Sequence, residues 1–370
     1  MAAGITPIVM PKWGLSMKEG TVTAWLVDVG TEISVGMPIL EVETDKIANA
    51  VEAPDPGLLR RKLAEVGDLL PVKALLGVMA DPGVSEADID AYVAAYVTPA
   101  ADEADDEAAN AYQFITVDGI RVRYARKGDG PGTPVLFIHG FGGDLDNWLF
   151  NIDAIADRAP VIALDLPGHG QSDIALPGTS IAALAAYVGH FLRALDVPRA
   201  HLVGHSMGAA IAAQLALDAP ASVASLTLID AAGLGDEVNT GYTDGFVTAT
   251  SRRDLKPVLE LLFADAALVS RQMVDDVLRY KRLDGVGALL GELGSALFGG
   301  GQQQEQPGRR LGANPPALVL WGREDRIIPA SHASHAPAGA HVEILDRAGH
   351  MAQMERASDV NARILQHIGA

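Results

Sequence analysis

The sequence contains no cysteine among its 370 residues. Disulfides are therefore excluded, and so is a protein thiol as nucleophile, which means that any sulfur chemistry must come from a prosthetic group or a co-substrate. Long apolar runs are also absent: no stretch of about 18 apolar residues occurs, and no basic segment followed by an apolar one opens the chain. We therefore expect a soluble, cytoplasmic protein without a membrane partner.

Basic side chains are scarce relative to acidic ones. Lysine and arginine together number 28, against 47 aspartates and glutamates, which gives a net charge of −19 at pH 7. Such a charge disfavours nucleic acid and anionic membranes as partners. The acidic excess is concentrated in residues 81–111, which hold nine acidic and no basic side chains. This distribution predicts a solvated connection between two domains, residues 1–80 and residues 112–370.

The acidic connection begins with a predicted helix. Ser85-Glu86-Ala87-Asp88 has the form of a capping box, and apolar residues follow it at helical spacing. We expect this helix to pack on one of the flanking domains, with binding of a partner as the alternative. Residues 98–111 continue with Thr-Pro and then Ala, Asp and Glu, a composition that predicts a disordered or loosely extended segment.

The first 80 residues contain an internal repeat. Residues 20–42 match residues 57–79 at an offset of 37 positions, so that Gly20 corresponds to Gly57 and Leu26 to Leu63. Each half reads as short strands of alternating polarity that are separated by glycine turns. Because neither half can bury a core alone, we expect two small sheets that pack together as a flattened all-β barrel.

A lysine follows the first repeat in the segment Glu43-Thr44-Asp45-Lys46. The symmetry of the repeat predicts a tight turn there, and the simplest interpretation is a surface lysine in an ordinary turn. The segment and the repeat together resemble the lipoyl domains of 2-oxo-acid dehydrogenase complexes over about residues 5–80. Biotin carriers place methionine on both sides of their lysine, whereas Asp45 and Ile47 flank this one. The resemblance therefore implies covalent lipoate on Lys46.

From about Tyr112 onward, buried apolar strands alternate with helices, which predicts a mostly parallel sheet covered on both faces. A strand hairpin is expected around Asp118-Gly119. The expected buried strands are Val135–Ile138, Val161–Leu164, His201–Val203, Leu226–Ile229 and Leu318–Leu320. Helices are expected at Ile181–Leu195 and Gly208–Leu217, and an insertion at about 234–312 is expected to form a helical cap. Within the insertion, helical stretches are expected around Lys256–Phe263 and Ser270–Tyr280, and Gly299–Gln304 is expected to be a mobile loop or hinge.

The segment Gly204-His205-Ser206-Met207-Gly208 lies directly after one strand and before one helix. That context is required by the G-x-S-x-G nucleophile elbow, in which a sharp turn exposes the serine hydroxyl. His350, in a loop after the last strand, is the candidate general base, and Asp325 is the candidate acid, with Asp230 as the alternative. The order Ser206, Asp325, His350 fits this fold.

The loop His139-Gly140-Phe141-Gly142-Gly143 resembles the oxyanion loop of α/β-hydrolases, and the resemblance covers residues 112–370. It implies that the backbone N–H groups of Phe141 and Met207 face the oxyanion. The remaining histidines at positions 139, 169 and 205, together with Asp165, are expected to be loop-packing residues. Arg252-Arg253 and Arg309-Arg310 are interpreted as solvated surface charge, with binding of an anionic co-substrate as the alternative.

A lipoyl domain joined to an α/β-hydrolase domain is similar in layout to the acetyltransferase subunits of acetoin dehydrogenase systems. The resemblance implies transfer of an acetyl group from lipoyl-Lys46 to coenzyme A, for which an acyl-Ser206 intermediate is our hypothesis. It also implies two partners, a thiamine-diphosphate-dependent acetoin dehydrogenase component and dihydrolipoamide dehydrogenase. The alternatives are a serine esterase or thioesterase that uses the lipoyl domain for docking, and a non-catalytic adaptor.

The trimeric acyltransferase core of related complexes is not expected. That core carries a His-x-x-x-Asp-Gly motif, but none of the four Asp-Gly pairs has histidine four positions earlier. The oligomeric state, the native acyl group, the coenzyme A site and the choice between coenzyme A and water as acceptor all stay open at the level of sequence.

Overall fold

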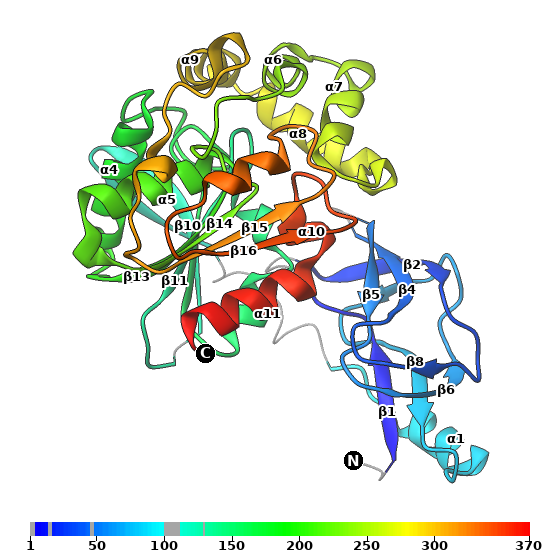
Figure 1. Cartoon of the computed structure of the whole chain (residues 1–370). Coiled ribbons are helices and arrows are strands. Elements are labelled where there is room, and N and C mark those ends of the chain that lie inside the picture. The colour runs from blue at the N-terminus through cyan, green and yellow to red at the C-terminus, as the bar shows by residue number, and fades with distance from the viewer. Residues whose placement is uncertain (1–3, 14–16, 45–47, 100–111, 129) are drawn as a thin grey trace. The chain divides into compact units, whose positions relative to one another are not determined.

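The computed structural model describes residues 4–13, 17–44, 48–99, 112–128 and 130–370. The chain divides into two compact units, Met1–Asn110 and Ala111–Ala370 (Figure 1). The sequence predicts a disordered or loosely extended segment at residues 98–111. Of these, residues 100–111 lie outside the described residues. No helix in the described part of the chain is long and apolar enough to cross a membrane.

The described residues of the first unit form two four-stranded sheets, with the strand orders β1-β8-β6-β3 and β5-β4-β2-β7. The strands are β1 (Ile5–Val9), β2 (Glu19–Trp25), β3 (Glu32–Ile33), β4 (Pro38–Glu43), β5 (Ala48–Glu52), β6 (Gly57–Lys62), β7 (Leu69–Pro71) and β8 (Leu75–Ala80). One core cluster of apolar side chains, among them Val22, Leu40, Leu59 and Leu76, lies between the sheets. The predicted flattened barrel of two sheets is confirmed.

The internal repeat explains how the two sheets are built. Strands β2, β3 and β4 belong to the first copy, and β6, β7 and β8 belong to the second. In each copy the first strand pairs with its own third strand and with the second strand of the other copy. The two halves thus exchange one strand each, so that neither sheet can form without both copies.

Helix α1 (Glu86–Ala95) packs on the first unit. Its buried residue Ile89 joins a second apolar cluster with Ile5 and Val78, and the side chain of Ser85 accepts a hydrogen bond from Asp88 N at the N-terminus of the helix. Arg60 forms an ion pair with Glu86 at 2.6 Å. The helix that the sequence predicts after residue 85 is therefore part of the first compact unit.

The second unit is built on an eight-stranded sheet with the order β16-β15-β14-β13-β11-β12-β10-β9. Its strands are β9 (Tyr112–Val117), β10 (Ile120–Lys127), β11 (Val135–Ile138), β12 (Val161–Leu164), β13 (Ala200–His205), β14 (Val223–Ile229), β15 (Ala317–Gly322) and β16 (His341–Leu345). The strands from β11 to β16 are parallel, and β9 and β10 form an antiparallel hairpin at one edge. The hairpin turns at Asp118 and Gly119, both of which have positive φ, as hairpin turns of two residues require.

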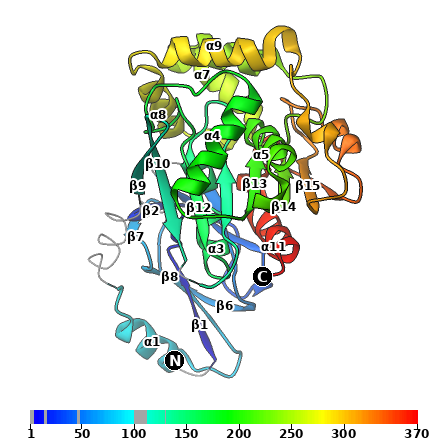
Figure 2. The same cartoon turned by 90° about the vertical axis from the view of Figure 1, so that its left-hand side faces the viewer.

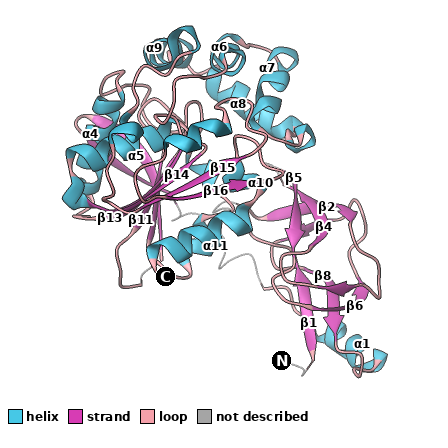
Figure 3. Ribbon diagram, in the orientation of Figure 1, coloured by secondary structure: helices cyan, strands magenta, loops and turns pink. Residues whose placement is uncertain are grey.

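Helices cover the sheet of the second unit (Figure 3). Helix α5 (Met207–Asp218) contacts β13 and β14, and α4 (Ile181–Ala194) packs on α5. Helix α11 (Ala357–Ile368) contacts β14 and β15 and packs against α3 (Ile152–Ala156). The buried strands that the sequence predicted all belong to this sheet, and the α/β-hydrolase architecture is confirmed.

Four helices between β14 and β15 form the cap: α6 (Thr240–Thr248), α7 (Arg252–Leu259), α8 (Arg271–Lys281) and α9 (Val286–Phe298). Figures 1 and 2 both show them gathered at one end of the sheet. The sequence predicted helical structure near α7 and α8 but not α6 or α9. The Gly- and Gln-rich segment after α9, which was expected to be a mobile loop or hinge, is anchored: Gln303 is buried and its side chain accepts from Gly233 N at 2.7 Å.

Candidate active site

Ser206 stands in the turn between β13 and α5, in a left-handed backbone conformation with φ 53° and ψ −120°. The two glycines of the motif allow this turn because of close contacts. A Cβ atom on Gly204 would lie 2.4 Å from Gly208 O, and one on Gly208 would lie 2.1 Å from Ile138 O. Both distances are far below van der Waals contact, so the turn requires glycine at both positions.

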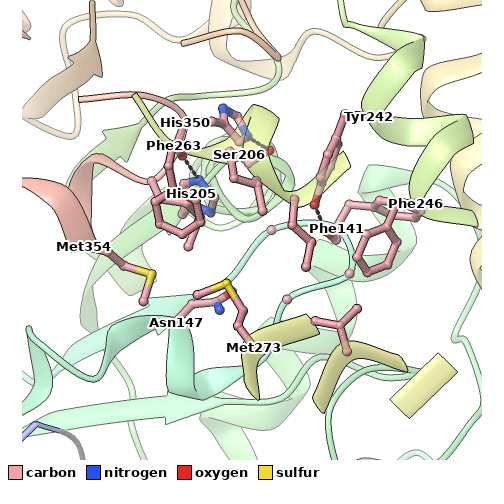
Figure 4. Close-up of a pocket in the computed structure, with 17 residues that line it drawn as sticks. Phe141, Asn147, His205, Ser206, Tyr242, Phe246, Phe263, Met273, His350 and Met354 are labelled. Carbon is pink, nitrogen blue, oxygen red and sulfur yellow. Dashed lines mark hydrogen bonds between the residues drawn. The ribbon is translucent and has the colours of Figure 1, made fainter. Parts of the chain in front are cut away.

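The three residues that the sequence selected lie in one hydrogen-bonded row (Figure 4 shows Ser206 and His350). His350 Nε2 is 2.9 Å from Ser206 Oγ, and His350 Nδ1 is 2.8 Å from Asp325 Oδ2. A neutral imidazole with its proton on Nδ1 donates to the carboxylate and accepts from the serine hydroxyl. This geometry allows His350 to take the hydroxyl proton when Ser206 attacks a carbonyl carbon.

The carboxyl group of Asp325 is held by its own loop after β15. Oδ1 accepts from Ile327 N at 2.8 Å and from Ile328 N at 3.0 Å. Oδ2 accepts from Trp321 Nε1 at 3.2 Å in addition to His350 Nδ1. These donors fix the direction in which Asp325 presents its oxygen to the imidazole.

Asp230, the alternative acid, has different partners. It ends β14 in a left-handed conformation and accepts from Gly322 N at 2.7 Å and Ala352 N at 3.2 Å. Burial, followed by the nearby charge of Asp325, raises the pKa of Asp230 well above its usual value. Of the two aspartates, Asp325 is the one paired with His350, whereas Asp230 binds the backbone beside each of these residues.

The two residues expected at the oxyanion position lie on the loop after β11 and at the start of α5. Phe141 lines the cavity at Ser206, and Met207 is the first residue of α5, where its own N–H has no acceptor within the helix. The peptide group that carries the Phe141 N–H is held at its other end, where Gly140 O accepts from His139 Nδ1 at 2.8 Å and from Gly143 N at 3.2 Å. Because the C=O and N–H of a trans peptide point in opposite directions, these bonds fix the direction of the Phe141 N–H.

His139 and His205 do more than fill space in their loops. His139 Nε2 accepts from Leu166 N at 2.9 Å, which leaves Nδ1 as the donor to Gly140 O, and burial lowers the pKa of His139 to about 4. His205 Nε2 donates to the backbone carbonyl of His350 at 2.6 Å, and burial lowers the pKa of His205 well below its usual value. Both histidines are therefore neutral, and their hydrogen bonds hold the backbone of the active site in place.

His169 and Asp165 have structural partners, as the sequence analysis expected. His169 Nδ1 donates to Pro167 O at 3.0 Å, and burial lowers the pKa of His169 to about 3. Asp165 accepts from Arg123 Nε at 2.6 Å and from Leu145 N at 2.8 Å. Neither residue contacts Ser206 or His350 through a hydrogen bond in the described part of the chain.

A cavity opens at Ser206 between the sheet and the cap, with about 600 Å³ of space that includes its open mouth. Its wall is mostly apolar and carries no lysine or arginine among the described residues. The lining consists of Gly140, Phe141, Gly142, Gly143, Asn147, His205, Ser206, Tyr242, Phe246, Leu259, Leu262, Phe263, Met273, Val277, His350, Met351 and Met354. The wall of the cavity therefore suits an uncharged, aliphatic arm.

Two arginines of the cap insertion have acidic partners. Arg252 forms an ion pair with Asp275, and Arg309 forms one with Asp236, as expected of surface charge.

Lys46 lies outside the described residues. The strands on either side of it are described: β4 and β5 are antiparallel, with Glu43 opposite Ala48. A lipoyl or biotin carrier has its modified lysine between two strands of this kind, so the described neighbours fit the group that the sequence implies.

Comparison with known proteins matches both units. A family model for the alpha/beta hydrolase fold matches residues 133–357, and one described as biotin-requiring enzyme matches residues 6–79. A crystallised meta-cleavage product hydrolase from Pseudomonas fluorescens aligns with a TM-score of 0.62 and 23% identity, over 70% of this chain and 97% of its own. The second unit therefore belongs to the α/β-hydrolase fold family.

Two relatives share both units. One, from Cupriavidus necator, is 66% identical over 99% of this chain and 98% of its own length. The other, from Pseudomonas putida, is 48% identical over 98% of each chain. Both are named the dihydrolipoyllysine-residue acetyltransferase component of an acetoin cleaving system. The chain belongs to this family.

Proposed function

We propose that this protein transfers an acetyl group from lipoate on Lys46 to coenzyme A, through an acetyl ester on Ser206, as one component of an acetoin cleaving system. The observation that carries the proposal is the hydrogen-bonded row of Ser206, His350 and Asp325 at a cavity with an apolar wall, in a chain that also has a carrier domain. When bound, lipoate supplies a thiol that carries the acetyl group as a thioester.

The first half of the reaction moves the acetyl group to the enzyme. His350 Nε2 takes the proton of Ser206, and Ser206 Oγ attacks the thioester carbonyl carbon. The backbone N–H groups of Phe141 and Met207 hold the negative oxygen, each donor contributing about 3–4 kcal/mol in the transition state. The carbon–sulfur bond then breaks, and His350 would give its proton to the departing sulfur while the acetyl group stays on Ser206 Oγ.

The second half moves the acetyl group to coenzyme A. The thiol of coenzyme A loses its proton to His350, its sulfur attacks the ester carbon, and Ser206 Oγ recovers the proton. No other base lies within hydrogen-bonding distance of Ser206 Oγ among the described residues. One imidazole therefore serves both halves.

The acetyl group must reach lipoate from another component. We propose a thiamine-diphosphate-dependent acetoin dehydrogenase component as its source and dihydrolipoamide dehydrogenase as the enzyme that reoxidises the carrier thiols. The relatives' names support this, because each describes one component of a larger system.

The test is the Ser206→Ala variant. It should form no acetyl-CoA, a loss of at least about 10³-fold, because the attacking oxygen is gone. Acetylation of Lys46-bound lipoate by the dehydrogenase component should continue at the wild-type rate, measured by intact mass. Acetyl-CoA formation at the wild-type rate by this variant would refute the acetyl-serine route.

Hydrolysis is the second candidate, because the same hydroxyl–imidazole–carboxylate row activates water as well as a thiol. The protein would then be a serine esterase or thioesterase that uses its carrier domain for docking. Supplying the acetylated carrier with and without coenzyme A separates the two functions. The transferase forms acetyl-CoA in preference to acetate, whereas the hydrolase forms acetate whether or not coenzyme A is present.

A further inference from the structure

Among the described residues that line the cavity at Ser206, one side chain has a hydrogen-bond donor that is not already used. Of the polar residues in its wall, Ser206 and His350 bind each other, His205 Nε2 donates to the carbonyl of His350, and the Tyr242 hydroxyl donates to Phe141 O at 3.3 Å. His205 Nδ1 has no partner, but it is buried out of reach and can only accept. The side chain that is left is Asn147.

The amide of Asn147 is oriented by its own turn. Asn147 Oδ1 accepts from Asp144 N at 3.3 Å as part of the capping box of the turn η1 (Leu145–Trp148). The oxygen also lies tightly against Gly143, where a Cβ atom would be 2.1 Å from it. Because the oxygen is committed in this way, the amino group is the part of the Asn147 side chain that is left to bind a ligand.

The amino group of Asn147 has no acceptor among the described residues. In the view of Figure 4, Asn147 and Met273 lie across the cavity from Ser206 and His350. An N–H donor in an apolar wall loses its hydrogen bonds to water when a ligand fills the cavity, unless the ligand itself brings an acceptor. Such a donor therefore discriminates in favour of ligands with a suitably placed oxygen.

The surroundings define that oxygen. No lysine or arginine is among the residues that line the cavity, so a single neutral donor would leave a carboxylate or phosphate uncompensated. A carbonyl oxygen of an amide is uncharged and a good acceptor. Lipoyl and pantetheine arms both carry such an amide at a distance from their sulfur.

We propose that Asn147 is a specificity-determining residue whose amino group binds the amide carbonyl of the thiol-bearing arm that enters the cavity. The inference rests on the proposed function and adds to it the group by which the arm is recognised. Asn147 then binds the donor arm, the acceptor arm, or each in turn, and takes no part in the bond changes at Ser206.

The test uses Asn147→Asp in the full-length protein. Aspartate keeps an oxygen for Asp144 N but loses the amino donor. For amide-bearing substrates, S-acetyldihydrolipoamide as donor and coenzyme A as acceptor, KM should rise roughly tenfold for whichever arm Asn147 binds, with kcat changed less. For amide-free counterparts, S-ethyl thioacetate and ethanethiol, KM and kcat should stay within about twofold of wild type.

The separate results for donor and acceptor identify the arm. An equal fall in kcat for all four substrates would show that position 147 acts on the reacting carbonyl and would overturn the inference. Unchanged kinetics with every substrate would also overturn it. Asn147→Ala, which lacks both the donor and the oxygen, should raise the same KM. If Asn147→Ala raises KM and Asn147→Asp does not, Asn147 serves only the turn, and the inference is wrong. The proposed function is judged separately, by whether the wild-type protein transfers acetyl to coenzyme A.

Discussion

At the scale of single residues, two aspartates with buried side chains help to hold His350 in place. Asp325 orients the imidazole directly, and Asp230 accepts from Gly322 N and Ala352 N, which lie three residues before Asp325 and two residues after His350. A carboxyl group that binds only backbone N–H groups can hold loops in place without titrating during the reaction. The two residues therefore have separable effects on rate and on stability.

Asparagine substitutions should separate these effects. Asp325→Asn should reduce kcat by about 10³- to 10⁴-fold, because an amide can stabilise the wrong tautomer of His350 and cannot stabilise its protonated form. Asp230→Asn should leave kcat within about tenfold of wild type. It should lower the free energy of unfolding by about 1–3 kcal/mol, because one backbone N–H loses its acceptor. Steady-state kinetics and urea unfolding of both variants check this, and a larger loss of kcat in the Asp230 variant would contradict it.

The three residues of the hydrogen-bonded row could be predicted from the sequence, but the groups that hold them could not. Ser206, Asp325 and His350 each follow a strand in the order that this fold needs, and order is a property of sequence. The bonds from His139 to Gly140 O, from His205 to His350 O and from Trp321 to Asp325 depend on side-chain directions that only the folded structure sets. No spacing rule encodes these directions, and none encodes the direction of the Asn147 amide.

At the scale of elements, helix α10 (Ala352–Glu355) joins the cap to the loop of His350. Glu355 accepts from Gly349 N at 2.6 Å on one side, and from Ala264 N at 2.8 Å and Asp265 N at 3.3 Å on the other. Burial raises the pKa of Glu355 to about 7, more than these hydrogen bonds lower it. One carboxyl group thus connects the edge of the cavity to the residue next to the proposed base.

The raised pKa predicts a pH-dependent stability. Between about pH 4.5 and pH 7 the folded protein retains the proton of Glu355, whereas the unfolded chain releases it. The stability that this group contributes therefore falls as the pH rises through that window, by at most about 3 kcal/mol. Glu355→Gln lacks the titration, so the difference in unfolding free energy, wild type minus variant, should be larger at pH 5 than at pH 8. A difference independent of pH would contradict this assignment.

The buried strands of the second unit were predictable because each is a short apolar run between turn residues. Helix α6 was missed because glycines at positions 241 and 245 and its threonines have low helix propensity. It forms because the Asn239 side chain accepts from Gly241 N at its N-terminus and because Tyr242 and Phe246 are buried. Tertiary packing, which a local pattern does not contain, decides its conformation.

At the scale of the whole molecule, one chain contains both Lys46, the proposed carrier lysine, and Ser206, the proposed nucleophile. Covalent attachment sets the local concentration of a carrier domain near its own active site, which for a flexible connection is roughly millimolar. Transfer within a chain should then exceed transfer between chains whenever the protein is micromolar. Variants that each lack one of the two functions can measure this difference.

Lys46→Arg removes the attachment point for lipoate but leaves Ser206, and Ser206→Ala does the reverse. Each variant alone should form no acetyl-CoA with the dehydrogenase component, while the Lys46 variant should still turn over S-acetyldihydrolipoamide at the wild-type rate. An equal mixture at micromolar concentration can react only between chains. Its rate should be about a hundredth of the wild-type rate or less, and should rise in proportion to protein concentration, because the second chain is present at micromolar rather than millimolar concentration. A mixture that works at the wild-type rate would show that the carrier of one chain serves the Ser206 of another, and the effective unit of the reaction would then be an assembly of chains.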